Sequence, residues 1–347
     1  MRPDTGATRA VVSRVVRATA GILLLGFAMA AGSGSAAEPR AAWMRNAGFG
    51  VMVHYLPEWI DAEREWTVEA WNAQVGGFDV EALARQAEGT GAGYVVLSIG
   101  QNSGFYLAPN PAYDRLTGIR PSKCSRRDLV AELARALERR GLRLLVYLTS
   151  GPPSNDPAAG KALGWEGDGR PNREFQRRWE TVVAEWSRRW GRAVSGWWFD
   201  GCSRPNTMYR SPRPPNFASF AAAARAGNPA TAVAFSPGLY YPVYPLSPHE
   251  DYTAGLIYDF EREFVNARRV SEGRVDGAQL HVLSFLGRTW GRGEPRFRAD
   301  QVLAYTGKVR EHGGAVTWDV PVQPDGTIAE PFLERLGPLG RTADDRP

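Results

Sequence analysis

The chain has 347 residues, of which 43% are hydrophobic and 23% are charged, a composition typical of a globular protein with one large core. Its formal net charge is +5. Four arginines and one aspartate in residues 1–37 contribute +3, so a chain without this segment would carry only +2. This small charge, together with the lack of any nucleic-acid-binding motif, excludes nucleic acid as an expected partner.

Residues 1–37 have the three parts of a secretory signal peptide. Four arginines form a basic start, residues 21–32 are an apolar run, and residues 35–37 (SAA) offer small side chains for cleavage before Glu38. The apolar run is too short for a membrane span, which needs about 20 residues, and no cysteine follows it to carry a lipid. We therefore expect an exported, secreted or periplasmic mature chain of residues 38–347 without a membrane partner.

A unit of amphipathic helix, glycine and short apolar strand repeats along this mature chain. Asp79 precedes one such helix, Ser125 and Asp128 resemble a capping box before the next, and Asn172 precedes a third. Two further helices are expected over residues 299–311 and 329–336. The predicted strands cover residues 48–55, 94–99, 142–149, 194–199, 230–236, 252–258 (the weakest), 280–286 and 315–318.

Eight buried strands that alternate with helices predict a parallel sheet closed into a barrel. No Gly-x-Gly-x-x-Gly or phosphate-binding loop follows a strand, which argues against an open nucleotide-binding sheet. Proline-rich segments over residues 151–169, 203–215 and 237–248 would lie on the rim where barrels build their sites. The predicted fold is α/β class, a single-domain (β/α)8 TIM-like barrel.

The chain contains two cysteines, Cys124 and Cys202. Each follows a predicted strand or its loop, so the two thiols could meet in an exported protein, but one pair is no disulfide framework. A bridge and two free thiols are equally compatible with the sequence. The four histidines lack metal-ligand spacing, and we expect neither a metal nor another cofactor.

The sharpest candidate for chemistry is Asp200 in residues 197–201 (WWFDG). It places a carboxylate just past a buried strand, on the rim that hosts barrel active sites. The alternative interpretation is an ordinary Asp-Gly turn or a helix cap. The flanking aromatic residues favour a site, because flat rings at a barrel mouth suit the faces of sugars.

Residues 197–201 resemble the α-L-fucosidases of glycoside hydrolase family 29, whose fourth strand typically ends in a Trp-Phe-Asp-Gly-like motif with the nucleophilic aspartate. The resemblance extends from about residue 45 to 340 and implies a barrel that hydrolyses a terminal fucose-like sugar with retention, using Asp200 as the nucleophile. We expect no separate C-terminal β-domain. The similar segments, in order, are residues 49–55 (FGVMVHY), 65–66 (EW), 92–94 (AGY), 127–130 (RDLV), 313–314 (GG) and 324–326 (PDG).

The chain departs from this family at three places. Residues 101–105 (QNSGF) replace His-His-Asp-Gly-Phe, so two imidazoles that grip sugar hydroxyls are missing and Asn102 is the remaining candidate. Residues 236–238 (SPG) replace Asn-x-Arg, and the position of the acid/base glutamate falls on Leu256. The acid is then expected from residues 259–263 (DFERE), with Glu261 as first choice, although this segment is equally an exposed charged turn.

Other candidates for contact with the substrate follow from position and residue type. By resemblance, His54 would bind a sugar hydroxyl, with a buried structural histidine as the alternative. Glu65 is a second candidate acid on the rim. Aromatic residues expected to contact the sugar are Tyr147, Trp66, Trp198 and Trp290.

The sequence thus predicts an exported retaining exo-glycosidase with a carbohydrate substrate, with Asp200 as nucleophile and Glu261 as acid/base. Two alternatives stay open. One is a non-hydrolytic carbohydrate-binding relative that has lost the acid and the histidine pair. The other is a barrel glycosidase with a different sugar specificity.

Overall fold

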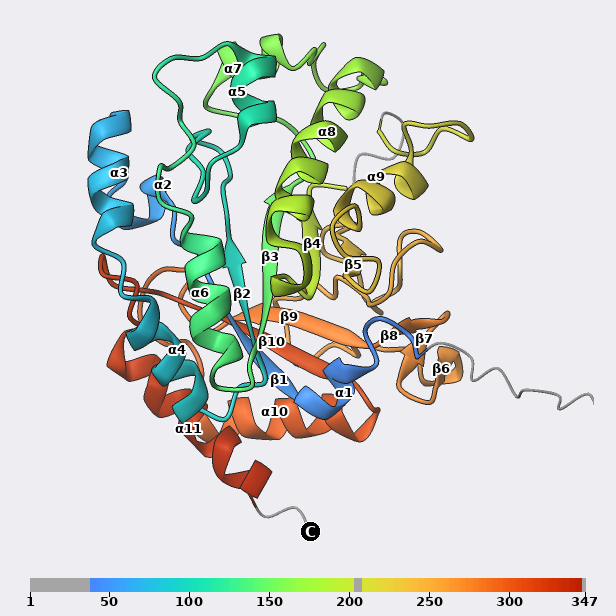
Figure 1. The fold of residues 1–347 in the computed structure, drawn as a ribbon. Coiled ribbons are helices and arrows are strands. Elements are labelled where there is room, and N and C mark those ends of the chain that lie inside the picture. Colours follow the sequence, from blue (N-terminus) through green and yellow to red (C-terminus); the bar gives the residue numbers. More distant parts are fainter. Residues whose placement is uncertain (1–37, 203–207, 345–347) are drawn as a thin grey trace, which may run out of the picture. The chain divides into compact units, whose positions relative to one another are not determined.

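The computed structural model of the protein describes residues 38–202 and 208–344. The predicted signal peptide lies outside these residues. Seven described strands form one parallel sheet (Figure 1), whose strands are, in spatial order, β5 (Ala232–Phe235), β4 (Gly196–Asp200), β3 (Arg143–Thr149), β2 (Tyr94–Ser98), β1 (Phe49–Val53), β10 (Ala315–Val320) and β9 (His281–Phe285). A small antiparallel sheet contains β6 (Val270–Ser271), β7 (Arg274–Val275) and β8 (Ala278–Gln279).

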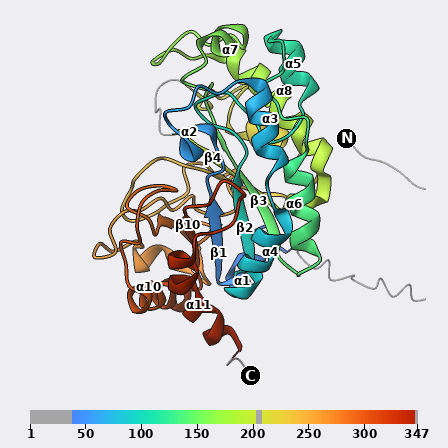
Figure 2. The same ribbon diagram turned by 90° about the vertical axis from the view of Figure 1, so that its left-hand side faces the viewer.

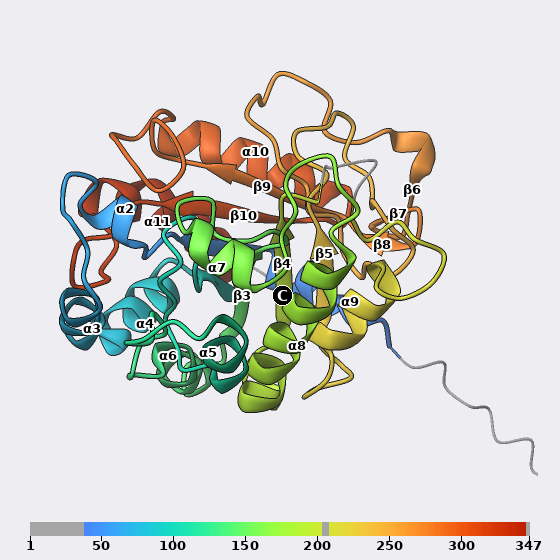
Figure 3. The same ribbon diagram turned by 90° about the horizontal axis from the view of Figure 1, so that it is seen from above.

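Helices surround the curled sheet when it is seen from above (Figure 3). Figure 2 shows α3, α4 and α6 along one side of the strands, with α10 and α11 on the other. The helices are α1 (Trp43–Ala47), α2 (Pro57–Ile60), α3 (Val68–Gly76), α4 (Val80–Gly89), α5 (Pro111–Thr117), α6 (Leu129–Glu138), α7 (Pro157–Ala162), α8 (Arg173–Trp190), α9 (Phe217–Ala224), α10 (Ala299–Glu311) and α11 (Glu330–Asp344), with short 3₁₀ turns at Gly191–Ala193 and Ala267–Arg269.

Both faces of the sheet are apolar because both are covered. Successive residues of a strand point to opposite faces. In β4, Trp197 and Phe199 pack outward in the large core beneath the helices, whereas Trp198 points inward. The inward set forms a second core that includes Met52 and Leu145 from β1 and β3. The sequence therefore shows continuous apolar runs rather than alternation, as expected for a parallel sheet.

The expected closed barrel of eight strands is not found among the described residues. The predicted sixth strand, residues 252–258, forms only isolated parallel bridges, from Tyr252 to Gln279 of β8 and from Leu256 to Leu283 of β9. Gly255 interrupts this segment with a φ of +66°, outside the extended region. The sheet is therefore a seven-stranded parallel half-barrel, with an irregular segment in the place of the eighth strand.

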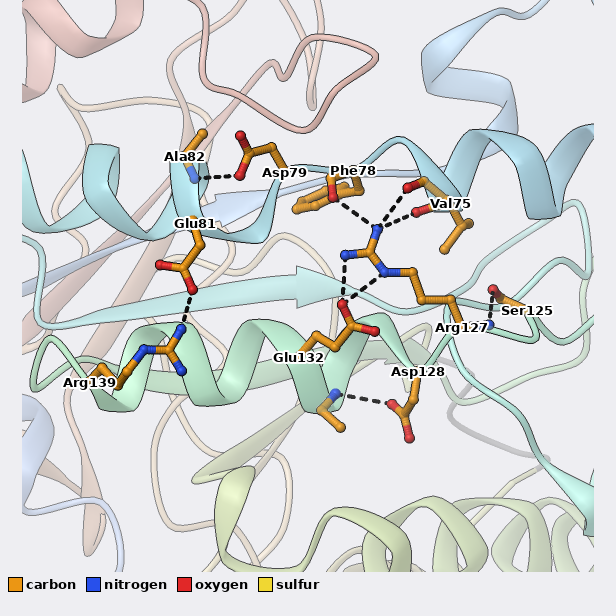
Figure 4. A network of polar contacts seen from close by, with 12 residues as sticks. Val75, Phe78, Asp79, Glu81, Ala82, Ser125, Arg127, Asp128, Glu132 and Arg139 are labelled. Carbon is orange, nitrogen blue, oxygen red and sulfur yellow. Dashed lines mark hydrogen bonds and ion pairs between the residues drawn. The ribbon is translucent and has the colours of Figure 1, made fainter.

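The Arg-Asp-Leu-Val segment at residues 127–130 has a structural role (Figure 4). The Arg127 guanidinium donates to the carbonyl oxygens of Val75, in the last turn of α3, at 2.7 Å and of Phe78, just after this helix, at 2.9 Å. It also pairs with Glu132 at 2.7 Å, in the first turn of α6. Asp128 caps α6 by accepting from the Ala131 N–H at 3.0 Å. This segment therefore ties α3 to α6.

Replacing Arg127 with leucine should lower the free energy of unfolding by about 2–3 kcal/mol, because carbonyl oxygens lose a charged donor. The measurement is urea denaturation of wild type and variant. Arg126→Leu is the matched control, since Arg126 is the exposed neighbour with the same charge, and it should shift stability by less than about 0.5 kcal/mol. Equal losses in the two variants would refute the structural role of Arg127.

His281 lies inside the sheet and should make the fold sensitive to acid. Burial lowers its pKa to about 4, while Nδ1 lies 2.9 Å from the Thr253 carbonyl oxygen and Nε2 lies 2.7 Å from Thr317 Oγ1. The unfolded chain, with a histidine pKa of about 6.5, then binds a proton that the folded chain does not. His281 should therefore cost about 3 kcal/mol of stability as the pH falls from about 6.5 to about 4.

Nuclear magnetic resonance of the ¹⁵N-labelled ring measures this directly. The His281 nitrogens should keep the shifts of a neutral imidazole down to about pH 5, while urea midpoints fall over the same range. An imidazole at position 281 that titrates near its ordinary pKa in the folded protein would contradict the prediction.

Cys124 and Cys202 are both buried free thiols, so of the two possibilities that the sequence left open, the structure shows no disulfide between them. Within the described part of the chain, no helix is both long and apolar enough to cross a membrane. Residues 38–202 and 208–344 also contain no group of three His, Cys, Asp or Glu side chains arranged to hold a metal ion.

Candidate functional site

The carboxyl ends of the parallel strands gather the polar residues of one site. Met52 and Trp198 point to the inside of the curled sheet, and so does Tyr147. His54 lies two positions after Met52, and Asp200 lies two positions after Trp198. Because side chains alternate along a strand, all three polar groups point to the inside of the curled sheet. The helices α2 and α7, which follow β1 and β3, lie at the same upper end in Figure 1.

A cavity of about 280 Å³ opens at this end of the sheet. It combines polar groups with an apolar and aromatic wall, as small-molecule sites usually do. Its lining residues are Met52, His54, Trp59, Gln101, Tyr147, Trp198, Asp200, Leu256, Tyr258, Leu283 and Trp290.

Asp200 is held by a donor on each oxygen. The Tyr147 hydroxyl donates to Oδ2 at 2.7 Å, and the Gly201 N–H donates to Oδ1 at 2.8 Å. Gln101 in turn donates to the Tyr147 oxygen at 2.8 Å. These bonds fix the orientation of the carboxylate in the cavity wall and leave lone pairs free on both oxygens.

Tyr147 is a permanent donor in this arrangement. Burial raises its pKa well above the usual value, and the negative charge of Asp200 adds to the effect. The phenol therefore stays protonated across the physiological pH range and keeps its hydrogen bond to Asp200. Asp319 and Glu58 also raise the pKa of Tyr147, which places these carboxylates in the surroundings of the cavity.

His54 and Asp319 form a buried pair beside the cavity. Asp319, on β10, is completely buried, and its Oδ1 lies 2.7 Å from Nδ1 of His54. Its other oxygen accepts from the Gly291 N–H at 2.5 Å. Because the carboxylate accepts at Nδ1, the imidazole carries its hydrogen there and its Nε2 edge is available for a ligand. The ring also stacks on Trp59, with centroids 5.5 Å apart.

Aromatic rings form the walls. Trp198 stacks on Tyr147 with centroids 5.4 Å apart and donates from its indole nitrogen to the Ala254 carbonyl oxygen at 3.0 Å. Trp59 donates to the backbone oxygen of Trp290 at 2.7 Å. Tyr258 is 43% exposed and lies at the mouth. These bonds hold the rings in place, so the cavity keeps its shape without a ligand.

Gln101 has an unused acceptor in the cavity lining. Its Nε2 is occupied by Tyr147, but its buried Oε1 has no hydrogen-bond partner among the described residues. A buried acceptor without a donor costs about 1–3 kcal/mol. A hydroxyl group of a ligand would satisfy it.

The structure brings five of the sequence-predicted site residues together and leaves four outside. The five that line the cavity are His54, Tyr147, Trp198, Asp200 and Trp290. Trp66 packs edge-on against the core residue Trp71, with centroids 5.8 Å apart, and Glu65 is exposed. Asn102 bonds through Oδ1 to Ser154 Oγ at 2.9 Å. Glu261 is exposed as well.

Glu261 stays away from the cavity because its neighbour is anchored in the helical layer. The Phe260 ring stacks on Phe297 and Tyr305, both with centroids 4.1 Å apart, and packs edge-on against Trp318. Phe260 therefore fixes this turn on the outer face of the sheet. The structure does not bring Glu261 to Asp200.

Sequence reasoning missed several residues of the site. Asp319 is the last residue but one of β10, and Asp200 is the last residue of β4. Each directly follows an outward aromatic residue, Trp318 or Phe199, and that shared pattern could have identified Asp319. Gln101 could have been found as the first polar residue beyond β2. Nothing in the local sequence marks Trp59, which reaches the cavity only because α2 turns back over His54.

No protein-family model and no curated protein matches the chain. Solved structures do. The endo-fucoidan hydrolase P5AFcnA from glycoside hydrolase family 107 superposes with a TM-score of 0.65 at 17% identity, over 88% of this chain and 93% of that one. The endo-fucoidan hydrolase MfFcnA4 from the same family superposes with a TM-score of 0.67 at 20% sequence identity. The match covers 87% of this chain, and the chain spans about half (53%) of MfFcnA4.

The α-L-fucosidase AlfC from Lactobacillus casei, solved with its α-L-fucose product, superposes with a TM-score of 0.60 at 16% identity. The match covers 88% of this chain and 98% of AlfC. Identities this low establish the fold alone. The chain therefore shares the fold of fucosidase-like glycoside hydrolases.

Proposed function

We propose that the protein is a retaining glycoside hydrolase that acts on a fucose-like sugar, with Asp200 as its nucleophile. One observation carries the proposal: the Asp200 carboxylate lies in the wall of a fixed aromatic cavity, with a donor behind each oxygen. A carboxylate held in this way is preorganised to attack an anomeric carbon. The shared fold supports the same interpretation.

The lining also supports the class of sugar. Met52, Leu256 and Leu283 form an apolar part of the cavity, while Gln101 and His54 offer polar atoms. A fucose-like sugar has the matching chemistry, since its methyl group replaces one hydroxymethyl group and its ring carries several hydroxyls. The names of the fold relatives, fucoidan hydrolase and α-L-fucosidase, agree with this class.

In the proposed reaction, an Asp200 oxygen bonds to the anomeric carbon as the bond to the leaving oxygen breaks. The carboxylate must stay ionised to attack. Tyr147 and the Gly201 N–H stabilise its negative charge and hold its direction, and Trp198 closes the wall behind Tyr147. Water then releases the sugar from Asp200 with a second inversion, so that the anomeric configuration is retained overall.

The purified mature chain should hydrolyse 4-nitrophenyl α-L-fucopyranoside, and proton nuclear magnetic resonance during the first minutes should show the α-anomer of fucose. A panel of other aryl glycosides tests the sugar class. Release of the β-anomer would rule out the retaining mechanism. Binding of fucosylated glycans without turnover of any aryl glycoside would favour a binding protein.

A further inference from the structure

The proposed reaction needs a proton donor, and the expected one is absent from the cavity. Hydrolysis of an unactivated glycoside requires a group that protonates the leaving oxygen and later takes a proton from water. Glu261 is exposed on the outer side of a turn anchored by Phe260. Among the described residues that line the cavity, Asp200 is the one carboxylate.

We infer that His54 is this acid/base, and that Asp319 is the positioning residue that orients it; the inference rests on the proposed function. Apart from Asp200, the lining side chains with a dissociable proton are His54, Tyr147 and Tyr258. Tyr147 has a raised pKa and is already bonded to Asp200. Tyr258 lies at the exposed mouth. Imidazole is the group that exchanges protons most readily near neutral pH.

The surroundings of His54 hold its ring in one orientation in the cavity wall. Only 5% of the residue is exposed, its Nδ1 is held 2.7 Å from Asp319, and its ring is stacked on Trp59. Asp319 is in turn fixed by the Gly291 N–H. A buried carboxylate at Nδ1 fixes the tautomer and the orientation of the ring and leaves the opposite nitrogen to act on a ligand.

Charged and titratable groups surround this pair on several elements. Asp319 comes from β10, Tyr147 from β3 and Asp200 from β4. Glu58, on α2, accepts the Ser103 N–H at 3.2 Å and has a second oxygen that is buried and makes no hydrogen bond within the described residues. Arg292 stacks on Trp59, with 5.0 Å between its guanidinium carbon and the ring centroid. Glu58 is therefore the rival acid that a test must include.

Protons and electron pairs are conserved over the two steps of the proposed reaction. As Asp200 bonds to the anomeric carbon, the electron pair of the breaking bond goes to the leaving oxygen, which takes the proton from Nε2 of His54. Neutral His54 then removes a proton from a water molecule, whose oxygen attacks the anomeric carbon. The bond to Asp200 breaks and its electron pair returns to the carboxylate. His54 is again protonated, and one water molecule has been consumed.

The test compares two leaving groups in His54→Gln, Glu58→Gln and Glu261→Gln. With His54→Gln, kcat/KM for a methyl or disaccharide glycoside should fall about 10²–10⁴-fold, the usual contribution of a general acid. For the 4-nitrophenyl glycoside the fall should stay below about 10-fold, because this leaving group needs little protonation. Azide should accelerate that residual turnover and give a glycosyl azide with the configuration of the substrate. Glu58→Gln should show no such selectivity, and Glu261→Gln should resemble wild type.

Asp319→Asn gives a second readout, which also covers the case in which His54→Gln does not fold. Asp319→Asn keeps the size of the side chain but removes the buried charge that orients His54, so kcat/KM should fall more for the methyl glycoside than for the 4-nitrophenyl glycoside, a selectivity that general destabilisation would not produce. If His54→Gln lowers kcat/KM equally for both leaving groups, His54 only binds a sugar hydroxyl and the inference is overturned. The proposed glycosidase function would be unaffected by that result. Selectivity in Glu58→Gln would also overturn it. A wild-type protein without turnover would overturn both proposals.

Discussion

Replacing Asp200 with asparagine should lower kcat for 4-nitrophenyl α-L-fucopyranoside by about three orders of magnitude or more, since the covalent step loses its nucleophile. Asparagine has the same size and can still accept from Tyr147 or Gly201, so the fold and the affinity for the sugar should change little. Steady-state kinetics measures the first effect, and calorimetric titration with fucose measures the second. Loss of turnover with retained binding is the expected pair of results.

Azide separates a missing nucleophile from a damaged site. Asp200→Ala leaves room for a small anion at the place of the carboxylate, and azide should restore turnover and give a glycosyl azide of inverted configuration. The His54 variant should give the retained configuration instead, so the two products distinguish the two roles. Full activity of Asp200→Asn would refute the mechanism, and failure of azide in both variants would argue against a covalent intermediate.

Replacing Gly255 with alanine should cost about 3–5 kcal/mol of stability, because the added methyl group combines backbone strain with a steric collision. Gly255 has a φ of +66°, and a Cβ there would lie 2.0 Å from the His281 carbonyl oxygen and 2.7 Å from the Val282 Cα. These are backbone atoms of β9, which cannot move aside independently. The Gly255 carbonyl oxygen also accepts from the Leu283 N–H at 2.9 Å, so the added methyl group would separate residues 252–257 from β9.

Gly277→Ala is the matched control. Gly277 has a similar φ of +88° in the turn between β7 and β8, but open space surrounds the place of a Cβ. Its substitution should therefore cost only the conformational strain of about 1–2 kcal/mol. Urea denaturation of the two variants separates strain from collision. If both variants lose the same stability, the close approach at Gly255 has no energetic importance.

The sequence predicted most elements of the fold because their signals are local. The helix expected over residues 299–311 is α10 to the residue, and Asp79 caps α4 as predicted. At α6 the predicted capping box is wrong, because Asp128 and not Ser125 is the N-cap. The continuous apolar runs predicted the positions of the parallel strands. The error lies at residues 252–258, where apolar composition predicted a strand although Gly255 has a positive φ. Composition does not report which glycine must approach a neighbouring backbone.

For the site, the sequence by itself determined which side chains stand at strand ends. Asp200 and His54 were identified in this way, because the linear sequence shows directly where a polar residue stands at the end of an apolar strand. The proton donor was assigned to Glu261 by counting along a loop, and loop residues have no fixed direction. Only the packing of Phe260 on Phe297 and Tyr305 decided that this turn faces outward.

The tertiary structure alone decided the partners of those side chains. Asp319 is 265 residues from His54 in the chain, yet their side chains meet because β1 and β10 are neighbours in the sheet. The pairing of β1 with β10 joins the first strand of the sheet to the last, and residue spacing carries no information about such a contact. The physical reason is that curling places the inward side chains of non-consecutive strands in one small volume, where hydrogen bonds form between residues that no local pattern connects.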